Sequence, residues 1–366
     1  MKNKNIDKKL LFTVIALSIF GLVMIASAGV IYSKTRFGDP GYFFKHQLLY
    51  GFLPGLVVLY FFGKIDYHFW KKLAFPIIVA ALVALVLVFV PGIGSKVYGA
   101  NRWIGLGPIS FQPSEMAKIS IIIYLAAWLE SKGKQKIKDM YEGLFPFLGI
   151  LGIIGFLIIK QPDTGTMGAI ILIAMSIFFV SGARISHIFG LIIAGLTGLM
   201  ILIKIEPYRM NRFLTFMNPE VDPQGIGYQI NQALLAIGSG GIFGLGLGHS
   251  RQKFNYLPEP IGDSIFAIIG EELGMVGAIV VVLLFVTLAF RGYQIAKNAP
   301  DEFGKLMAVG ITSWIAFQAF INIAAISGII PLTGIPLPFV SYGGTSLIFL
   351  MSGAGILLNI SKQNNR

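Results

Sequence analysis

Long runs of apolar residues, separated by short polar stretches, cover most of the chain. A helix needs about 20 mostly apolar residues to cross a bilayer, and ten segments reach or approach that length. They lie at about 11–33, 46–63, 74–92, 113–129, 144–160, 166–182, 185–204, 264–290, 306–327 and 341–360. The pattern therefore predicts an all-α polytopic membrane protein with about ten transmembrane helices.

The polar stretches between these runs predict the topology. An even number of spans puts both termini on one side, and an excess of Lys and Arg marks the cytoplasmic side. With the termini in the cytoplasm, 17 of the 29 basic residues face the cytoplasm and 11 face outside. We therefore expect cytoplasmic termini, two shorter outside loops at 93–112 and 328–340, and one long extracytoplasmic loop at about 205–263. Aromatic, proline and glycine residues in that long loop favour an ordered, functional segment.

The first span has a second interpretation. Its basic start, its apolar stretch and the small residues at 26–28 resemble a cleavable signal peptide. The apolar stretch is nevertheless long enough to span, and cleavage would leave nine spans with the same basic loops, so we expect it to be retained. No internal repeat is visible, which disfavours transporters built from repeated halves. We expect a single integral-membrane domain over residues 1–366.

Composition narrows the class of protein and of partner. Hydrophobic residues make up 55% of the chain and charged residues 13%, whereas a soluble domain carries about 25% charged residues. The net charge of +12 would indicate nucleic acid in a soluble protein. In a membrane protein it indicates basic cytoplasmic loops that face anionic membrane lipid, so we expect no nucleic acid partner. The chain has no Cys and four His, which excludes thiol chemistry and disfavours a zinc site.

Four charged residues fall within predicted spans, where a charge is costly. Glu115 and Lys118 are three residues apart, so they share a helix face and can pair. Alternatively, Glu115 caps its helix and Lys118 extends outward to water. Glu271 and Glu272 are adjacent and point about 100° apart. We therefore expect that they do not line one narrow pocket together, and that at least one serves helix packing or pairing.

The outside segments carry the remaining candidates for chemistry. Asp263 directly precedes the eighth span, where it could cap the helix or act as a general base. The segment 160–166 is either a plain turn or a break that meets protein or a water-filled cavity. Among the charged outside residues, the candidates are the acids Asp163, Glu259 and Asp263 and the bases Arg102, Lys160, Arg209 and Arg212. Such cations suit a phosphate-bearing ligand, either an amphiphile or a transported anion.

Four segments carry a resemblance to a known family. They are GANRWIGLGPISFQPSEMAK (99–118), QPDTGT (161–166), the long segment 218–274 that includes GLGHSRQKFNYLPEPIGD, and PLTGIPLPFVSYGGTSL (331–347). In these segments the chain resembles the SEDS family of bacterial cell-wall proteins, whose branches are FtsW, SpoVE and RodA, and it is most similar to the FtsW and SpoVE branch. It departs from the family at Gly262-Asp263-Ser264, where Thr-Asp-Phe is typical.

The resemblance implies a peptidoglycan glycosyltransferase for cell division or cell-shape maintenance. It would polymerise lipid II on the outer face of the bacterial cytoplasmic membrane, by inverting transfer, with Asp263 as general base and undecaprenyl diphosphate as leaving group. The expected substrate-binding residues are Arg102, Glu115, Lys118, Lys160, Asp163, Arg209, Arg212 and Glu259. No cofactor is certain, and a divalent cation, Mg²⁺ or Mn²⁺, is the candidate.

The expected partners are a class B penicillin-binding protein that acts as transpeptidase, and divisome or elongasome proteins. Two other functions remain open. A lipid II flippase would use charges near the middle of the membrane, and a non-catalytic scaffold for the transpeptidase would use exposed contact surfaces.

Overall fold

Every predicted span coincides with a helix of the structure. The computed structural model describes residues 6–97, 100–106, 109–222 and 224–363. The ten helices are α1 (Lys8–Ala28), α4 (Leu53–Lys64), α6 (Ala74–Leu87), α7 (Pro113–Ile137), α8 (Phe145–Lys160), α9 (Thr164–Val180), α10 (Ile185–Ile205), α13 (Ile265–Lys297), α14 (Glu302–Ile326) and α15 (Gly344–Gln363). α3 (Tyr42–Gln47) and the π-helical turn η1 (Leu48–Phe52) lead into α4, and a second π-helical turn, η2 (Met140–Leu144), leads into α8.

In the part of the chain that the structure describes, seven helical segments are long and apolar enough to cross a membrane. They are Lys8–Ala28, Tyr42–Lys64, Met140–Lys160, Ile185–Ile205, Ile265–Lys297, Glu302–Ile326 and Gly344–Gln363. α6 and α9 are apolar but shorter, and α7 carries Glu115 and Lys118. The chain is therefore a multi-pass membrane protein, and the span count of ten stays a prediction for these three helices.

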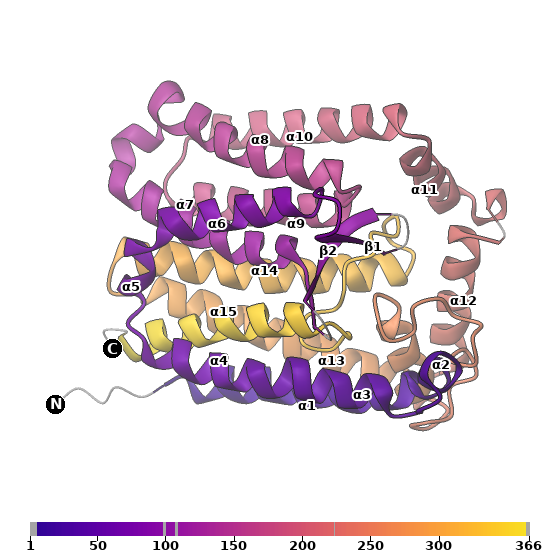
Figure 1. Ribbon diagram of the computed structural model, residues 1–366. Coiled ribbons are helices and arrows are strands. Elements are labelled where there is room, and N and C mark those ends of the chain that lie inside the picture. Colours follow the sequence, from indigo (N-terminus) through magenta and orange to yellow (C-terminus); the bar gives the residue numbers. More distant parts are fainter. Residues whose placement is uncertain (1–5, 98–99, 107–108, 223, 364–366) are drawn as a thin grey trace.

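The spanning helices run side by side, and both ends of the chain lie at the same end of the bundle (Figure 1). The short helix α5 (His68–Lys72) lies at that end too, whereas α2 (Val30–Phe37), α11 (Pro207–Met217) and α12 (Ile226–Ser239) lie at the opposite end. We call the end with the termini the terminal end and the opposite end the loop end.

A small sheet, which the hydrophobic pattern does not predict, interrupts the otherwise helical fold. β1 (Gly94–Val97), β2 (Ala100–Leu106) and β3 (Ile109–Phe111) form an antiparallel sheet in the order β1-β2-β3 within the predicted outside loop at 93–112. The segment folds back on itself between α6 and α7, which pack against each other.

The core lies around α14, which packs against α13, α9 and α7. Trp314 is fully buried on this helix, and Leu306 and Ile311 are buried beside it. α1 packs against α13 through a buried face that includes Leu10 and Leu17. α10, in contrast, has no buried residue.

The long loop is ordered, as its composition predicts. It contains α11, the 3-10 turn η3 (Pro219–Val221) and α12, followed by an irregular segment from 240 to 264. The glycine-rich run allows this segment to lie directly on α13. A Cβ atom on Gly240 would lie 1.9 Å from the carbonyl oxygen of Gly270, and Gly244 has a positive φ of 79°. The glycines therefore permit close contact with a helix, as the sequence predicts.

Candidate active site

Asp263 lies at the loop end, two residues before α13 begins, and its backbone is held from two sides. Asn322 on α14 donates from Nδ2 to the carbonyl oxygens of Asp263 and Ile335, both at 2.8 Å. Ser341 donates from Oγ to the carbonyl oxygen of Gly262 at 2.7 Å. One helix and the 331–342 segment therefore fix the position of the carboxylate.

The side chain of Asp263 is half-buried. Gln229 on α12 donates from Nε2 to Ser264 Oγ at 3.1 Å, and the same nitrogen lies 3.5 Å from Asp263 Oδ1. Gly334, with a φ of 71°, lies opposite, where an added Cβ atom would be 3.9 Å from Asp263 Oδ2. The helix-cap interpretation of Asp263 is wrong, because Ser264 occupies the N-cap position and no side chain caps α13.

The surroundings of Asp263 favour a basic carboxylate. Burial and the nearby charge of Glu259 raise the pKa of Asp263 to about 6, against the opposing effects of Arg212 and Gln229. At neutral pH the group is therefore mostly ionised, yet it binds a proton more readily than an ordinary carboxylate.

Arg212 is the cation that the structure brings to Asp263. Its Nη1 donates to the carbonyl oxygen of Leu332 at 3.1 Å, and its guanidinium lies 4.6 Å from the ring centre of Tyr208. Its Nε is buried and has no hydrogen-bond partner among the described residues. A buried donor of this kind is costly unless a ligand or water satisfies it, so Arg212 suits an anionic ligand.

Glu115 and Lys118 form a buried ion pair, so the pairing interpretation is confirmed. Lys118 Nζ donates to Glu115 Oε1 at 2.8 Å and to Gln318 Oε1 at 2.7 Å. Ser346 donates to the other oxygen of Glu115 at 3.1 Å. The alternatives are wrong, because Lys118 is only 1% exposed and does not extend to water.

Two amides on α14 connect this ion pair to Asp263. Gln318 donates from Nε2 to the carbonyl oxygen of Pro336 at 3.0 Å, and Asn322, one turn further on, holds Ile335 and Asp263. The sequence reasoning considered only ionisable groups and missed both amides. Their spacing of four residues within an apolar span was the available signal, since it places them on one helix face.

Arg102 and Asp163 both build the turn between α8 and α9. Arg102 on β2 donates from Nε to the carbonyl oxygen of Gln161 at 2.9 Å and from Nη2 to that of Pro162 at 2.5 Å. Asp163 caps α9, because its carboxylate accepts hydrogen bonds from the backbone N–H and the hydroxyl of Thr166. The segment is therefore a turn that lies against protein, since Gln161 and Asp163 are buried, and both charges are engaged within the protein.

The structure does not bring Lys160 or Arg209 into contact with Asp263. Lys160 is exposed at the end of α8, with its ammonium 5.7 Å from the ring centre of Phe156. Arg209 is buried on α11 and donates from Nη1 to the carbonyl oxygen of Leu202 at 3.4 Å, near the end of α10. Glu259, in contrast, is close enough to raise the pKa of Asp263.

Glu271 and Glu272 both hold the loop segment 248–253, through different partners. Glu271 accepts hydrogen bonds from the Ser250 hydroxyl at 2.5 Å and the Arg251 backbone N–H at 2.8 Å. Glu272 pairs with Lys253 at 3.0 Å. The loop segment 248–253 lies across α13 at these two residues. The two carboxylates point in different directions, and each contacts a different part of this segment. The predicted role in packing and pairing is confirmed.

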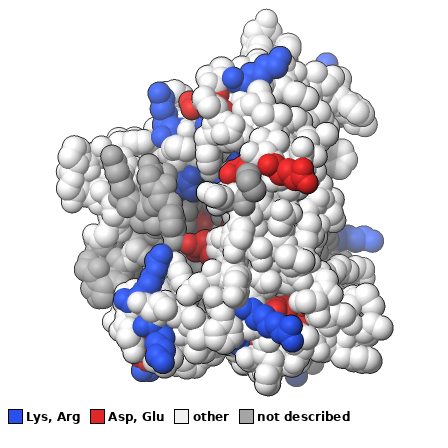
Figure 2. All heavy atoms as spheres, turned by 90° about the vertical axis from the view of Figure 1, so that its right-hand side faces the viewer, with Lys and Arg blue, Asp and Glu red and all other residues white. Residues whose placement is uncertain are grey.

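Charged side chains of both signs surround a recess on the loop end (Figure 2). Within the described residues, no group of three or more His, Asp or Glu side chains is arranged to hold a metal ion. The site therefore consists of one basic carboxylate, a second acid and an arginine with an unsatisfied donor.

A helical bundle whose described residues include seven segments long and apolar enough to span, with a polar site at one end, defines a multi-pass membrane protein with its candidate chemistry at one end of the bundle. Residues 8–366 match the model of the cell cycle protein family of FtsW, RodA and SpoVE. The chain belongs to this family.

Relatives of known name agree with this assignment. The chain is 43% identical to stage V sporulation protein E of Bacillus subtilis (strain 168), over 99% of both chains. It is 42% identical to the probable peptidoglycan glycosyltransferase FtsW of Trichlorobacter lovleyi, over 97% of this chain and 93% of that one.

Two solved structures share the fold. A chain from a structure on the coordination of polymerization and crosslinking by a peptidoglycan synthase complex has a TM-score of 0.80 and 27% identity, over 98% of both chains. The rod shape determining protein RodA of Thermus thermophilus has a TM-score of 0.72 and 27% identity, over 99% of this chain and 98% of that one.

Proposed function

We propose that this protein is a peptidoglycan glycosyltransferase that polymerises lipid II into glycan strands, with Asp263 as the general base. The observation that carries the proposal is the half-buried Asp263 carboxylate at the loop end, with its pKa raised to about 6 and an arginine beside it. The curated FtsW relatives are named as peptidoglycan glycosyltransferases, and they match the chain over almost its whole length.

The proposed step is the attack of a sugar hydroxyl of the acceptor on the anomeric carbon of the donor. A hydroxyl is a weak nucleophile at neutral pH, and a carboxylate that takes its proton during attack contributes about 10²–10⁴-fold to the rate. The bond from the anomeric carbon to the diphosphate oxygen breaks as the new glycosidic bond forms on the opposite face. One base is enough for this inverting transfer, so Glu271 and Glu272 need no catalytic role.

The leaving undecaprenyl diphosphate needs positive charge more than a proton. Arg212 is the residue placed for this role, because its buried Nε lacks a partner among the described residues and its charge acts on Asp263. Lys118 and Arg102 are engaged in the ion pair and the turn, so we propose that they shape the site instead. Arg209, Lys160 and Asp163 likewise have structural contacts and no direct role in this proposal.

A divalent cation stays compatible with the residues present. Mg²⁺ is commonly held by one or two carboxylates together with substrate phosphate oxygens and water. Glu259, near Asp263, would hold such an ion, which would neutralise charge on the diphosphate.

The proposal also includes the place of action and a partner. A loop end on the outer face of the bacterial cytoplasmic membrane would expose Asp263 to lipid II and leave the basic terminal end in the cytoplasm. The match to a chain of a peptidoglycan synthase complex that couples polymerization and crosslinking supports a transpeptidase partner of the class B penicillin-binding type. Divisome or elongasome proteins would then recruit both.

The test is polymerisation of labelled lipid II by purified protein in proteoliposomes, with and without the partner transpeptidase. We expect glycan strands from the wild type and at least about a hundredfold lower rate from Asp263→Asn, because the base is removed while the shape is kept. Asp39→Asn is the matched control, since this exposed carboxylate at the loop end pairs with Lys45 at 2.8 Å and accepts the Gly41 backbone N–H at 2.9 Å.

Three results would contradict the proposal. Equal polymerisation rates for Asp263→Asn and the control would show that Asp263 is not the general base. Movement of lipid II across the bilayer without polymer would identify a flippase. Stimulation of the transpeptidase by wild type and Asp263→Asn alike, without glycan from the wild type, would identify a scaffold.

A further inference from the structure

A basic pocket at the terminal end is unrelated to the site around Asp263. It has a volume of about 580 Å³ and lies between the end of α7, the turn that joins α9 to α10, and the start of α14. Its lining residues are Lys134, Lys138, Val180, Gly182, Ala183, Arg184, Ile185 and Lys305. Half of them are cations and none is an acid.

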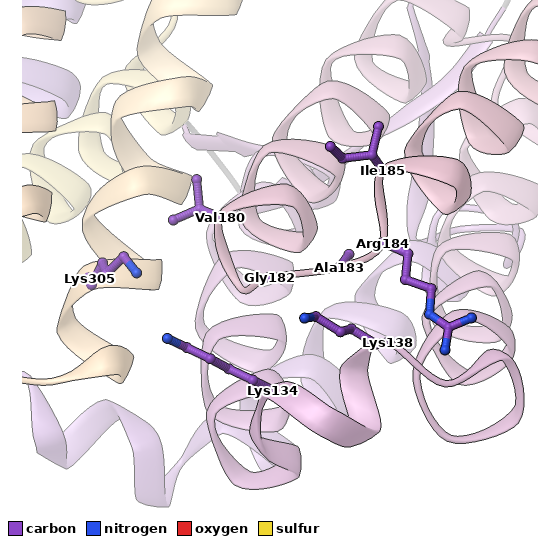
Figure 3. A pocket seen from close by; sticks show the side chains of 8 residues that line it. All are labelled: Lys134, Lys138, Val180, Gly182, Ala183, Arg184, Ile185 and Lys305. Carbon is purple, nitrogen blue, oxygen red and sulfur yellow. The ribbon is translucent and has the colours of Figure 1, made fainter.

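Three of the four cations extend into a common space beneath the α9–α10 turn (Figure 3). The ammonium ends of Lys134 and Lys305 point toward each other, Lys138 extends toward Gly182 and Ala183, and Arg184 extends to the far side of Lys138. The stem of Lys134 lies against the turn, because an added Cβ atom on Gly182 would be 3.9 Å from Lys134 Cγ.

These cations are incompletely neutralised by the protein. Within the described residues, Lys134, Lys138 and Arg184 form no ion pair within 4.0 Å. The Asp139 carboxylate caps η2, and the backbone N–H groups of Glu142 and Tyr141 lower its pKa more than the nearby charge of Arg184 does. Lys305 pairs with Glu302 at 3.1 Å. A net positive pocket remains.

The backbone adds to the attraction for anions. Arg184 is the N-cap of the 21-residue helix α10, and no side chain caps that end. The first N–H groups of a helix and its dipole favour a negative charge at this position. The cations and the helix start therefore favour the same ligand group, a phosphate.

The wall beside the pocket indicates that the phosphate carries an apolar tail. Ile185 lines the pocket and begins an apolar stripe on α10 that continues through Phe189, Ile193 and Leu196. These four side chains are between 59% and 65% exposed, and α10 has no buried residue. A lipid headgroup in the pocket would therefore direct its acyl chains along the stripe. Basic pockets beside membrane helices at the cytoplasmic surface are typical sites for anionic lipid headgroups.

We propose that this pocket binds the phosphate headgroup of an anionic phospholipid, with its acyl chains along α10. The lipid would join three parts of the bundle at the terminal end, namely the end of α7, the α9–α10 turn and α14. It would thereby hold the start of α10, which has little packing of its own.

The experiment measures lipid binding by native mass spectrometry and by the thermal midpoint of the full chain in a non-ionic detergent. The probes are dioctanoyl phosphatidylglycerol, dioctanoyl phosphatidylcholine with the same chains, and inorganic phosphate without chains. The variant is Lys134→Gln with Lys138→Gln. The control is Lys132→Gln with Lys136→Gln, which removes two charges from the same segment, but from side chains that pair with Glu142 outside the pocket.

We expect phosphatidylglycerol to bind and stabilise the wild type and the control. The pocket variant should bind it about thirtyfold more weakly, because each of the two removed cations contributes about fivefold to the affinity for an anionic headgroup. Added salt should weaken binding to the wild type. Arg184→Gln provides a second variant with a smaller loss, should the double variant be unstable.

Equal binding of phosphatidylglycerol by the pocket variant and the control would overturn the proposal. Equal stabilisation by phosphatidylcholine would overturn the requirement for an anionic headgroup, and equal stabilisation by inorganic phosphate would overturn the lipid as the source of phosphate. No binding of phosphatidylglycerol to the wild type would also overturn it, and this is the result expected if the pocket receives an acidic peptide.

Discussion

At the scale of the residue, Asp263 shows how neighbours change a common side chain into a candidate base. Its carboxylate is partly removed from water and lies near Glu259, and both effects disfavour its charge. Gln229 and Arg212 oppose this only in part. The sequence places the carboxylate at the outer end of a span, but its pKa depends on residues from α11, α12 and the 240–264 segment.

The raised pKa predicts the pH dependence of polymerisation. Only the ionised carboxylate accepts a proton, so kcat/KM should be level above about pH 7 and fall about tenfold per unit well below the pKa of about 6. The measurement is the initial rate with labelled lipid II between pH 4.5 and 8. A rate that stays level down to pH 5 would contradict the assignment.

The same shift predicts an effect on stability with the opposite sign from that of most acids. A folded-state pKa above the unfolded value of about 3.9 means that the contribution of Asp263 to stability is present below about pH 4 and is lost as the pH rises to about 6. Asp263→Asn should therefore stabilise the protein at pH 7.5 by about 1–2 kcal/mol, and by less at pH 5. Thermal midpoints in detergent at both pH values measure this difference, and a less stable variant at pH 7.5 would contradict it.

At the scale of the element, the contact between the glycine-rich segment and α13 depends on the absence of side chains. Gly240 is the C-cap residue of α12 and has a φ of −70°, which any residue can adopt. Only the lack of room for a side chain therefore disfavours a larger residue at this position. Gly238 lies two residues earlier. Apart from its own helix backbone and its chain neighbours, a Cβ atom added there would meet no atom of the described residues within 4 Å. The two glycines therefore form a matched pair.

Gly240→Ala should destabilise the protein, because its Cβ atom would lie 1.9 Å from the Gly270 carbonyl oxygen. Overpacking of this kind costs about 1–3 kcal/mol. Gly238→Ala should be neutral or stabilising by up to about 1 kcal/mol, because alanine favours the helix. The measurement is the thermal midpoint of both variants, and equal midpoints would show that α12 and α13 are not in close contact.

The Glu272–Lys253 pair fixes the same segment by charge. The two side chains are 0% and 5% exposed, so Glu272→Gln leaves the buried Lys253 ammonium with the Gly248 carbonyl oxygen but without its charged partner, at a cost of about 3–5 kcal/mol. Glu272→Gln combined with Lys253→Met should recover part of this loss in a thermal-melting double-mutant cycle. Glu302→Gln, at the half-exposed pair with Lys305, should cost less than about 1 kcal/mol. No recovery in the double variant would contradict a direct pair.

At the scale of the whole molecule, the distribution of basic residues and the fold describe the same topology. Both termini lie at one end of the bundle, as an even number of spans requires (Figure 1). The sequence assigns that end to the cytoplasm through its excess of Lys and Arg. A green fluorescent protein fused to the C-terminus should therefore fluoresce, and alkaline phosphatase inserted at Gly38, in the turn after α2, should be active. The reverse pattern would contradict the topology.

The positions of the apolar helices, the placement of both termini at one end, the family and Asp263 as the candidate base could all be obtained from the sequence. These features depend on local apolar runs, on charge bias and on motifs that are continuous along the chain. The small sheet, the shared role of Glu271 and Glu272, and the structural roles of Arg102 and Arg209 could not be obtained in this way.

Only the tertiary structure decided what surrounds Asp263. Asn322 holds its carbonyl oxygen from 59 residues away, and Ser341 holds that of Gly262 from 79 residues away. The free energy of transferring an apolar segment from water into lipid depends on the residues of that segment alone, so the local sequence is enough to predict the spanning segments. The hydrogen bonds, the burial and the pKa of Asp263 depend on which distant segments lie next to it. The packing of the helices around α14 determines which segments those are.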